Sequence, residues 1–299
     1  MKLLNYVRNG GYRLGIHTDA GIIDVAGAAA ASGQTELADL DIHQAISGGD
    51  TVLDKLLTLT DFVTGKPDNS HLLLDENGLT FGPAVNRPGK ILCVGLNYRK
   101  HAEETGSAIP QTPILFSKFS NALAGHLEDV PLPAVSQQVD YEAELAIVIG
   151  RTASNISKEE ALDYVFGYCC ANDLSARDLQ FRTQQWLLGK TCDKFAPVGP
   201  YLVTADEVRE PNALSISCYV NGEVRQASNT SDMIFHCDEI ISFASQHMTL
   251  EPGDIILTGT PEGVVLGYPT EKQVYLQAGD VVTVEIEKLG RLTNTMTAL

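Results

Sequence analysis

The sequence predicts a mainly β, α+β fold, in which a small N-terminal α/β domain (residues 1–85) precedes a larger domain (residues 86–299). The 299 residues suffice for one large and one small domain. Downstream of residue 90, short apolar segments separated by turn residues predominate, as is typical of β-strands. Between residues 79 and 90 lies a cluster of helix and strand breakers that marks the boundary: Gly82, Pro83, Pro88 and Gly89.

The N-terminal domain combines both kinds of element. Residues 1–25 alternate short apolar stretches with the turn sequences 9–11 and 18–21, which predicts hairpins. The alanine-rich stretch 27–31 and the periodic apolar residues of 51–57 predict helix within 26–66. No residue before the boundary suggests chemistry.

The larger domain begins with strand and helix in alternation and becomes almost entirely β later. One further helix is expected around 238–247, in the β-rich part. Two helices are expected from capping-box spacing, one at 157–166 (Ser157 and Glu160) and one opening at 175–178. A further helix is expected at 97–104. The expected strands are 91–96, 113–118, 145–150, 167–173, 214–220, 254–258 and 281–287.

The charge balance restricts the class of partner. Thirty-eight acidic residues against 21 basic ones give a formal net charge of −17, which disfavours nucleic acids and anionic membranes. No run approaches the roughly 20 apolar residues of a membrane span. The first residues lack the features of a signal peptide, and the six cysteines show no CxxC spacing, so we expect reduced thiols and a cytoplasmic location.

Two carboxylates, Glu142 and Glu144, stand at the entrance of the strand 145–150. Residues two apart share one face of a strand, about 6.5–7 Å apart. Like charges on a half-buried face repel, so either this face is solvated or a cation lies between them. Together with Asp173, at the end of the next expected strand, they form a set without Cys or His, which is typical of Mg²⁺ or Mn²⁺, with Ca²⁺ possible. Spacing alone leaves the solvated face open and does not predict Asp173 as a partner.

A second constellation lies on the expected helix 97–104. His101 and Glu104 are three residues apart and share a face, so the carboxylate can orient the imidazole as a base that activates water. Tyr98 is expected on the same face and is counted as substrate-binding. An exposed helical ion pair is the alternative.

A third set is cationic and polar. Arg177 and Gln180 share a helix face, and Lys190 follows a glycine in an expected loop; near a metal these groups would neutralise a substrate carboxylate. The turn 258–263 has glycines whose N–H groups could face an anion, and Thr260 offers a hydroxyl. Taken singly, each is more often an ordinary surface or turn group.

Taken together, these motifs resemble the fumarylacetoacetate hydrolase family, especially its smaller bacterial and organellar members. They occur in the family's order over about residues 90–296. The motifs are Gly95–Tyr98 with His101 and Glu104, Asp140–Leu145, Asn172–Gln180, Gly189–Lys190, Val220–Glu223, Asp232–Ile234 and Pro252–Pro261. Cys192 departs from the pattern by replacing an aromatic residue often seen after the Gly-Lys pair.

The resemblance implies a mixed β-roll catalytic domain, usually paired in a homodimer. It implies Mg²⁺ or Mn²⁺ held by the residues matching Glu142, Glu144 and Asp173. The catalytic group would comprise the dyad of His101 and Glu104, together with Lys190 as the cation on the substrate side. The remaining matched positions line the pocket: Arg177, Gln180 and Thr260.

The implied activity is hydrolysis of a C–C bond in a 1,3-diketo acid of the acylpyruvate or fumarylacetoacetate type. His101 would activate water, and an enolate would leave beside Lys190. Decarboxylation of oxaloacetate and isomerisation of a dienoic diacid remain alternatives on the same site, because substrate choice depends on pocket loops. A binding protein without turnover is a further hypothesis, against which the intact His101, Glu104 and Lys190 argue.

Overall fold

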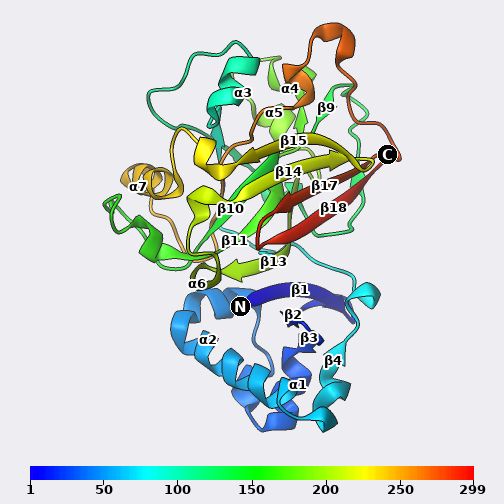
Figure 1. The fold of residues 1–299 in the computed structure, drawn as a ribbon, viewed down its shortest axis with the longest axis vertical. Helices are drawn as coiled ribbons and strands as arrows, with labels where there is room; N and C mark the ends of the chain where they lie inside the picture. Colours follow the sequence, from blue (N-terminus) through cyan, green and yellow to red (C-terminus); the bar gives the residue numbers. More distant parts are fainter.

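The computed structural model describes residues 1–299 and shows two lobes (Figure 1). The smaller lobe contains the N-terminal strands and helices, and the larger one contains the remainder of the chain. The elements of the smaller lobe are β1 (Lys2–Arg8), β2 (Gly11–Thr18), β3 (Gly21–Asp24), α1 (Val25–Ser32), α2 (Ile42–Thr64) and β4 (Leu73–Leu74).

The larger lobe is dominated by strands, which confirms the predicted mainly β, α+β class. Its helices are α3 (Arg99–Glu104), α4 (Arg177–Gln180), α5 (Leu187–Lys190), α6 (Ala205–Val208) and α7 (Cys237–His247). Its strands are β5 (Ile91–Gly95), β6 (Ile114–Lys118), β7 (Leu123–Ala124), β8 (Val130–Pro131), β9 (Val139–Asp140), β10 (Ala143–Ile149), β11 (Val165–Asn172), β12 (Ser175–Ala176), β13 (Ala196–Thr204), β14 (Ser215–Val220), β15 (Glu223–Asn229), β16 (Ile255–Leu257), β17 (Val281–Ile286) and β18 (Gly290–Thr297).

One long mixed sheet runs through both lobes. Its order is β4-β3-β2-β1-β13-β11-β10-β16-β5-β6, with β7 paired to β13. The lobes are joined where β1 pairs antiparallel with β13, Leu3 lying opposite Leu202. The apolar cluster on one face of this sheet also takes residues from both lobes, among them Leu3 and Val148. The boundary near residue 86 therefore stays a sequence prediction, across which the sheet and its core are continuous.

A second sheet covers the opposite face of the long sheet within the larger lobe. Its order is β15-β14-β17-β18-β8, and its strands contact β10, β11 and β13. Along β10, Leu145 and Ile147 belong to the core between the two sheets, whereas Ala146 and Val148 belong to the core on the other face. Both faces of β10 are buried, which explains its nearly continuous apolar sequence.

The register between β10 and β11 positions the carboxylates. Glu144 lies opposite Ala171, and the N–H of Asp173 donates to the carbonyl of Glu142 (2.9 Å). Because side chains alternate along both strands, Glu142, Glu144 and Asp173 project from the same face of the sheet.

Most predicted elements form, and three local predictions were wrong. The stretch 157–166 contains only a 3₁₀ turn, Ala161–Tyr164, because the hydroxyl of Ser157 bonds the Glu160 carboxylate instead of a helix N–H and β11 begins at Val165. The helix opening at 175–178 is a single turn, α4, since Ser175 belongs to β12. Lys190 ends the short helix α5 instead of lying in a loop. None of the helices combines the length and hydrophobicity needed to cross a lipid bilayer.

Candidate active site

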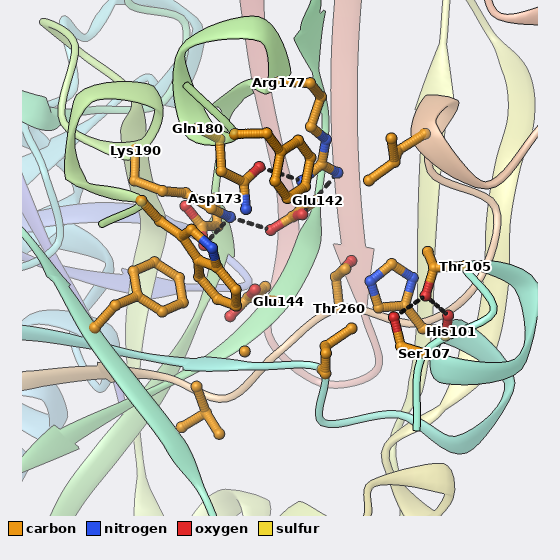
Figure 2. Close-up of a pocket in the computed structure, with 17 residues that line it drawn as sticks. His101, Thr105, Ser107, Glu142, Glu144, Asp173, Arg177, Gln180, Lys190 and Thr260 are labelled. Atoms are coloured by element: carbon orange, nitrogen blue, oxygen red, sulfur yellow. Dashed lines mark hydrogen bonds and ion pairs between the residues drawn. The ribbon is translucent and has the colours of Figure 1, made fainter. Parts of the chain in front are cut away.

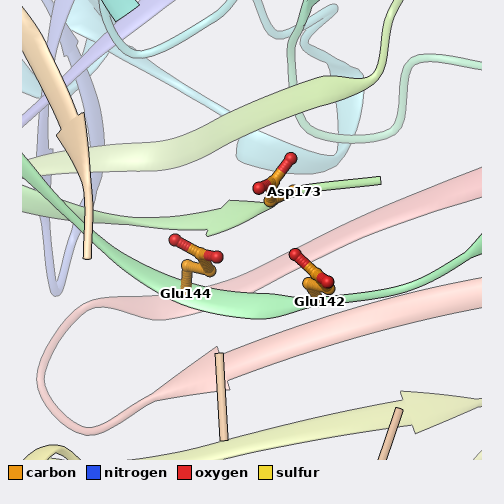
Figure 3. A group of neighbouring side chains, drawn as sticks. All are labelled: Glu142, Glu144 and Asp173. Atoms are coloured by element: carbon orange, nitrogen blue, oxygen red, sulfur yellow. The ribbon is translucent and has the colours of Figure 1, made fainter. Parts of the chain in front are cut away.

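Three buried carboxylates form the centre of the candidate site (Figure 3). Glu142 immediately precedes β10, Glu144 lies within it, and Asp173 follows the last residue of β11. One ligand oxygen of each lies within 4.8 Å of the others. The three residues are 5%, 2% and 0% exposed, respectively, so the alternative of a solvated strand face is wrong.

Three cations surround two of these carboxylates. The Lys190 ammonium lies 2.7 Å from Glu142 Oε2 and 2.8 Å from Asp173 Oδ2 (Figure 2). The Arg177 guanidinium lies 2.7 Å from Glu142 Oε1, and the Lys118 ammonium lies 2.6 Å from Asp173 Oδ1. Burial alone would raise the pKa of Glu142, but Lys190 and Arg177 hold that pKa well below its usual range.

Glu144 has no such cation. Its carboxylate accepts one hydrogen bond, from the N–H of Gly259 (2.7 Å). Burial, followed by the charges of Asp173 and Glu142, raises the pKa of Glu144 well above its usual range. A buried carboxylate without a cationic partner is costly unless another positive charge is supplied.

The charge balance of this buried cluster therefore fits a divalent cation. With Asp140, which also contacts Arg177, four buried carboxylates face three buried cations, leaving one negative charge uncompensated. The three candidate ligands offer only oxygen, the donor that Mg²⁺ and Mn²⁺ prefer. Glu142, Glu144 and Asp173 would hold the ion, with Lys190 beside it.

The second predicted group, the dyad of His101 and Glu104, is also formed. The ring Nδ1 of His101 lies 2.8 Å from Glu104 Oε1, and Glu104 Oε2 accepts from the N–H of Gly263 (2.9 Å). The other ring nitrogen, Nε2, has no partner in the protein, and the ring lines the same pocket as the carboxylates. Figure 2 shows the imidazole on the side of this pocket opposite Lys190. Such an arrangement leaves Nε2 free to accept a proton from a bound molecule.

The pocket between the dyad and the carboxylates has a volume of about 170 Å³. Four residues of the predicted set line it: Arg177, Gln180, Lys190 and Thr260. Arg177 and Gln180 share a face of α4 and are joined by a hydrogen bond of 3.0 Å. The remaining lining residues were not predicted: Val94, Gly95, Leu96, Thr105, Ser107, Phe116, Phe181, Trp186 and Leu266.

The turn 258–263 has a role different from the expected one. The N–H of Gly259 faces an anion, but that anion is the Glu144 carboxylate, and the N–H of Gly263 faces Glu104. The Thr260 hydroxyl donates to the carbonyl of Ala143 (2.9 Å) and accepts from the side chain of Gln226 (2.8 Å). The turn thus holds the carboxylates of Glu144 and Glu104, and Thr260 contributes mainly the shape of the pocket wall.

Tyr98 was wrongly predicted as a substrate contact. It is the N-cap of α3 with an extended backbone (φ −120°, ψ 136°), so the i, i+3 relation to His101 does not hold. The side chain is fully buried in the core between the two sheets and does not line the pocket.

Two buried charged residues outside the predicted set support the site. Lys118 donates to the carbonyls of Leu174, Lys190 and Phe195 besides pairing with Asp173. A strand ending in a lysine was visible in the sequence, but its partners lie 55 or more residues away and could not be read from spacing. Asp140 pairs with Arg177, 37 residues away, and accepts the N–H groups of Val265 and Leu266, 125 and 126 residues away.

Comparisons with known proteins identify the family of the chain. Residues 90–297 match the family described as fumarylacetoacetate (FAA) hydrolase, C-terminal. The mitochondrial oxaloacetate tautomerase Fahd2a of Rattus norvegicus is 48% identical over 223 residues, which are 74% of this chain and 71% of the relative.

Two solved structures share the whole fold. The fumarylacetoacetate hydrolase of Exiguobacterium antarcticum is 33% identical with a TM-score of 0.77, and all of both chains is covered. The maleylpyruvate hydrolase of Sphingobium sp. SYK-6, in complex with manganese(II) and pyruvate, is 30% identical with a TM-score of 0.78, covering 100% of this chain and 99% of that one. The matched family, the relatives and the fold lead to one conclusion: the chain belongs to the fumarylacetoacetate hydrolase family.

Proposed function

We propose that this protein is a divalent-metal-dependent keto–enol tautomerase of a small 2-oxo acid, of which oxaloacetate is the first candidate. The observation that carries the proposal is His101, whose Nδ1 is held by Glu104 while Nε2 faces the pocket that contains the carboxylates. The relative from Rattus norvegicus, 48% identical, is named an oxaloacetate tautomerase. A divalent cation, Mg²⁺ or Mn²⁺, held by Glu142, Glu144 and Asp173 would supply a Lewis acid.

The side chains supply the proton transfers. His101 Nε2 takes one proton from C3 of the keto acid, and Glu104 stabilises the resulting imidazolium. The C2 oxygen takes one proton from solvent as the C2–C3 double bond forms, and the His101 imidazolium returns its proton to solvent, so keto and enol forms interconvert without a net co-reactant. Two of the three N–H donors of Lys190 bond Glu142 and Asp173, which leaves one for this developing negative oxygen.

The size of the pocket supports a small substrate. Its volume of about 170 Å³ is below the roughly 300–1,000 Å³ of sites for drug-sized ligands. Its cations also suit an acid, since Arg177 and Lys190 both line the pocket in a protein of net charge −17.

Hydrolysis of a C–C bond in a 1,3-diketo acid is the second candidate. A neighbouring cavity of about 650 Å³ shares Thr105, Ser107, Phe181 and Leu266 with the pocket, which offers room for an acyl group. In that reaction His101 would take its proton from water instead of from carbon. The maleylpyruvate hydrolase structure, 30% identical, favours this candidate.

A substrate panel tests these proposals. The protein is assayed with Mg²⁺ and with Mn²⁺ on enol-oxaloacetate and on an acylpyruvate, and the loss of enol absorbance, the release of pyruvate and the release of CO₂ are followed separately. With wild type we expect loss of enol absorbance without release of pyruvate or CO₂. His101→Ala should abolish this activity. His247→Ala should retain it, because His247 lies on α7 outside the pocket. Equal rates for wild type and His101→Ala would refute the role of the dyad. Faster pyruvate release would favour the hydrolase, and CO₂ release that survives His101→Ala a decarboxylase.

The assembly and the location remain predictions as well. We expect a homodimer, which light scattering measures directly, a cytoplasmic location, and no nucleic-acid or membrane partner.

A further inference from the structure

Asp140 connects the two groups of the site, the dyad of His101 and Glu104 and the carboxylates that include Glu142, but it does not line the pocket. It ends β9, two residues before Glu142, and is 0% exposed. Its two carboxylate oxygens accept from the backbone N–H groups of Tyr141, Val265 and Leu266 and from the guanidinium of Arg177. The bonding capacity of the carboxylate is thus divided between the following loop and one cation.

The first connection leads to the dyad. The N–H groups of Val265 (2.9 Å) and Leu266 (3.0 Å) belong to the 3₁₀ turn Val265–Gly267, which Asp140 holds at its N-terminal end. The same loop encloses Glu104: the N–H of Gly263 bonds Glu104 Oε2, and a Cβ at Gly267 would clash with the Glu104 carboxylate. The position of the loop therefore decides the position of Glu104, and Glu104 orients the imidazole of His101.

The second connection leads to the carboxylates that would hold the metal. Nε and NH2 of Arg177 both lie 2.9 Å from Asp140 Oδ2, and NH2 also lies 2.7 Å from Glu142 Oε1. The hydrogen bond from Nε and the ion-pair contact of NH2, both to Asp140 Oδ2, restrict the rotation of the planar guanidinium. Asp140 thereby keeps the guanidinium of Arg177 beside the Glu142 carboxylate.

We propose that Asp140 is a positioning residue that sets the dyad and the metal-holding carboxylates relative to each other. This inference rests on the proposed function for the role of His101, but the part that concerns Glu142 does not need turnover. Partners of metal-holding or catalytic side chains typically change affinity or activity by about 10–100-fold when mutated.

The test uses Asp140→Asn with Asp254→Asn as its matched control. Asp254 is also 0% exposed, pairs with a cation (Lys90, 2.7 Å) and accepts a backbone N–H (Glu251, 2.8 Å), but it does not line the pocket. Both variants remove one buried, ion-paired charge, so both are expected to lower the thermal midpoint. Only Asp140→Asn is expected to lower kcat about 10–100-fold with a smaller change in KM, and to weaken Mn²⁺ binding by calorimetry about 10-fold or more.

A second variant separates the two connections. Val265→Pro removes one N–H donor to Asp140 at the first position of a 3₁₀ turn, where proline is tolerated, and the preceding Val264 is already extended (φ −67°, ψ 156°). We expect Val265→Pro to lower kcat while leaving Mn²⁺ affinity unchanged. At saturating Mn²⁺ in a Glu104→Gln background, Asp140→Asn should cause little further loss of kcat, because its effect on the dyad passes through Glu104.

The inference is overturned if Asp140→Asn and Asp254→Asn lower kcat and Mn²⁺ affinity equally, or if Asp140→Asn and Glu104→Gln act additively on kcat at saturating Mn²⁺. If no 2-oxo acid is turned over by wild type, the proposed function fails, whereas the Mn²⁺ affinities of Asp140→Asn and Asp254→Asn still decide the connection to Glu142. Should Asp140→Asn fail to fold, Val265→Pro decides the connection to the dyad: an unchanged kcat would reject it.

Discussion

Glu142 and Glu144 share a strand face, but substitution by glutamine should change stability in opposite directions. In the metal-free protein we expect Glu144→Gln to raise the free energy of unfolding by about 1–2 kcal/mol, the usual gain when an unfavourable group is relieved at a functional site. The structural reason is that Glu144 contacts no cation and faces two other carboxylates. For a domain of this size the gain corresponds to a rise in thermal midpoint of roughly 2–8 °C.

Glu142→Gln supplies the matched comparison. Glu142 lies 2.7 Å from both Lys190 and Arg177, and its removal leaves these buried cations short of one partner. Breaking a buried ion pair costs about 3–5 kcal/mol, so the metal-free midpoint should fall. Both variants are nearly isosteric with wild type, which makes charge the main difference between them.

The two effects also differ in their pH dependence. Because the pKa of Glu144 is raised in the folded state, the wild-type residue opposes folding increasingly as pH rises from its unfolded value through the folded one. The advantage of Glu144→Gln should therefore grow over that range. The pKa of Glu142 is lowered, so its contribution is present above the unfolded value and is lost as pH falls.

The assay is thermal unfolding with EDTA and again with Mn²⁺. A ligand at 100 times its Kd stabilises the folded state by about 2.7 kcal/mol, so saturating Mn²⁺ should make wild type more stable than Glu144→Gln. We expect almost no Mn²⁺-induced shift in Glu144→Gln. A lower metal-free midpoint for Glu144→Gln than for wild type at pH 8, or an equal Mn²⁺-induced shift in both, would refute the reasoning.

Three further predictions concern the same pocket. Glu104→Gln should lower kcat by about 10²-fold, which is within the typical contribution of acid–base catalysis, without weakening Mn²⁺ binding. Steady-state kinetics measure the first effect and calorimetry the second. A parallel loss of Mn²⁺ affinity would contradict the separation of the dyad from the carboxylates. Mn²⁺ affinity should rise with pH until Glu144 is fully ionised, and below that pH the binding of Mn²⁺ should release protons. Calorimetry in buffers of different ionisation enthalpy detects this release. No proton release at low pH would argue against Glu144 as a ligand. Tyr98→Phe should leave KM unchanged, because its hydroxyl lies in the core outside the pocket and makes no hydrogen bond; a several-fold change in KM would return Tyr98 to the substrate contacts.

Local patterns accounted for much of the fold. The turn at Asn9-Gly10 forms with positive φ at both residues (53° and 76°), as the hairpin requires, and β5, β6, β10 and β11 lie close to their expected ranges. The expectation failed at 157–166, where a capping-box pattern competed with residues that join β11. The local sequence favours a helix there, but strand pairing with distant residues prevails. A short window of sequence contains no information about that pairing.

The site residues also differ in whether local sequence could predict their arrangement. The sequence alone determined the pairs whose geometry is local: Glu142 with Glu144 by the two-residue period of a strand, and His101 with Glu104 by the three-residue spacing within a helical turn. Only the tertiary structure decided that Asp173 joins the first pair, that Lys190 and Arg177 compensate Glu142 while Glu144 lacks a cation, and that Tyr98 points into the core. These outcomes depend on strand register and on contacts between residues far apart in the chain. Burial and the charges that meet there, which no spacing rule encodes, turn a pair of glutamates into a candidate metal site.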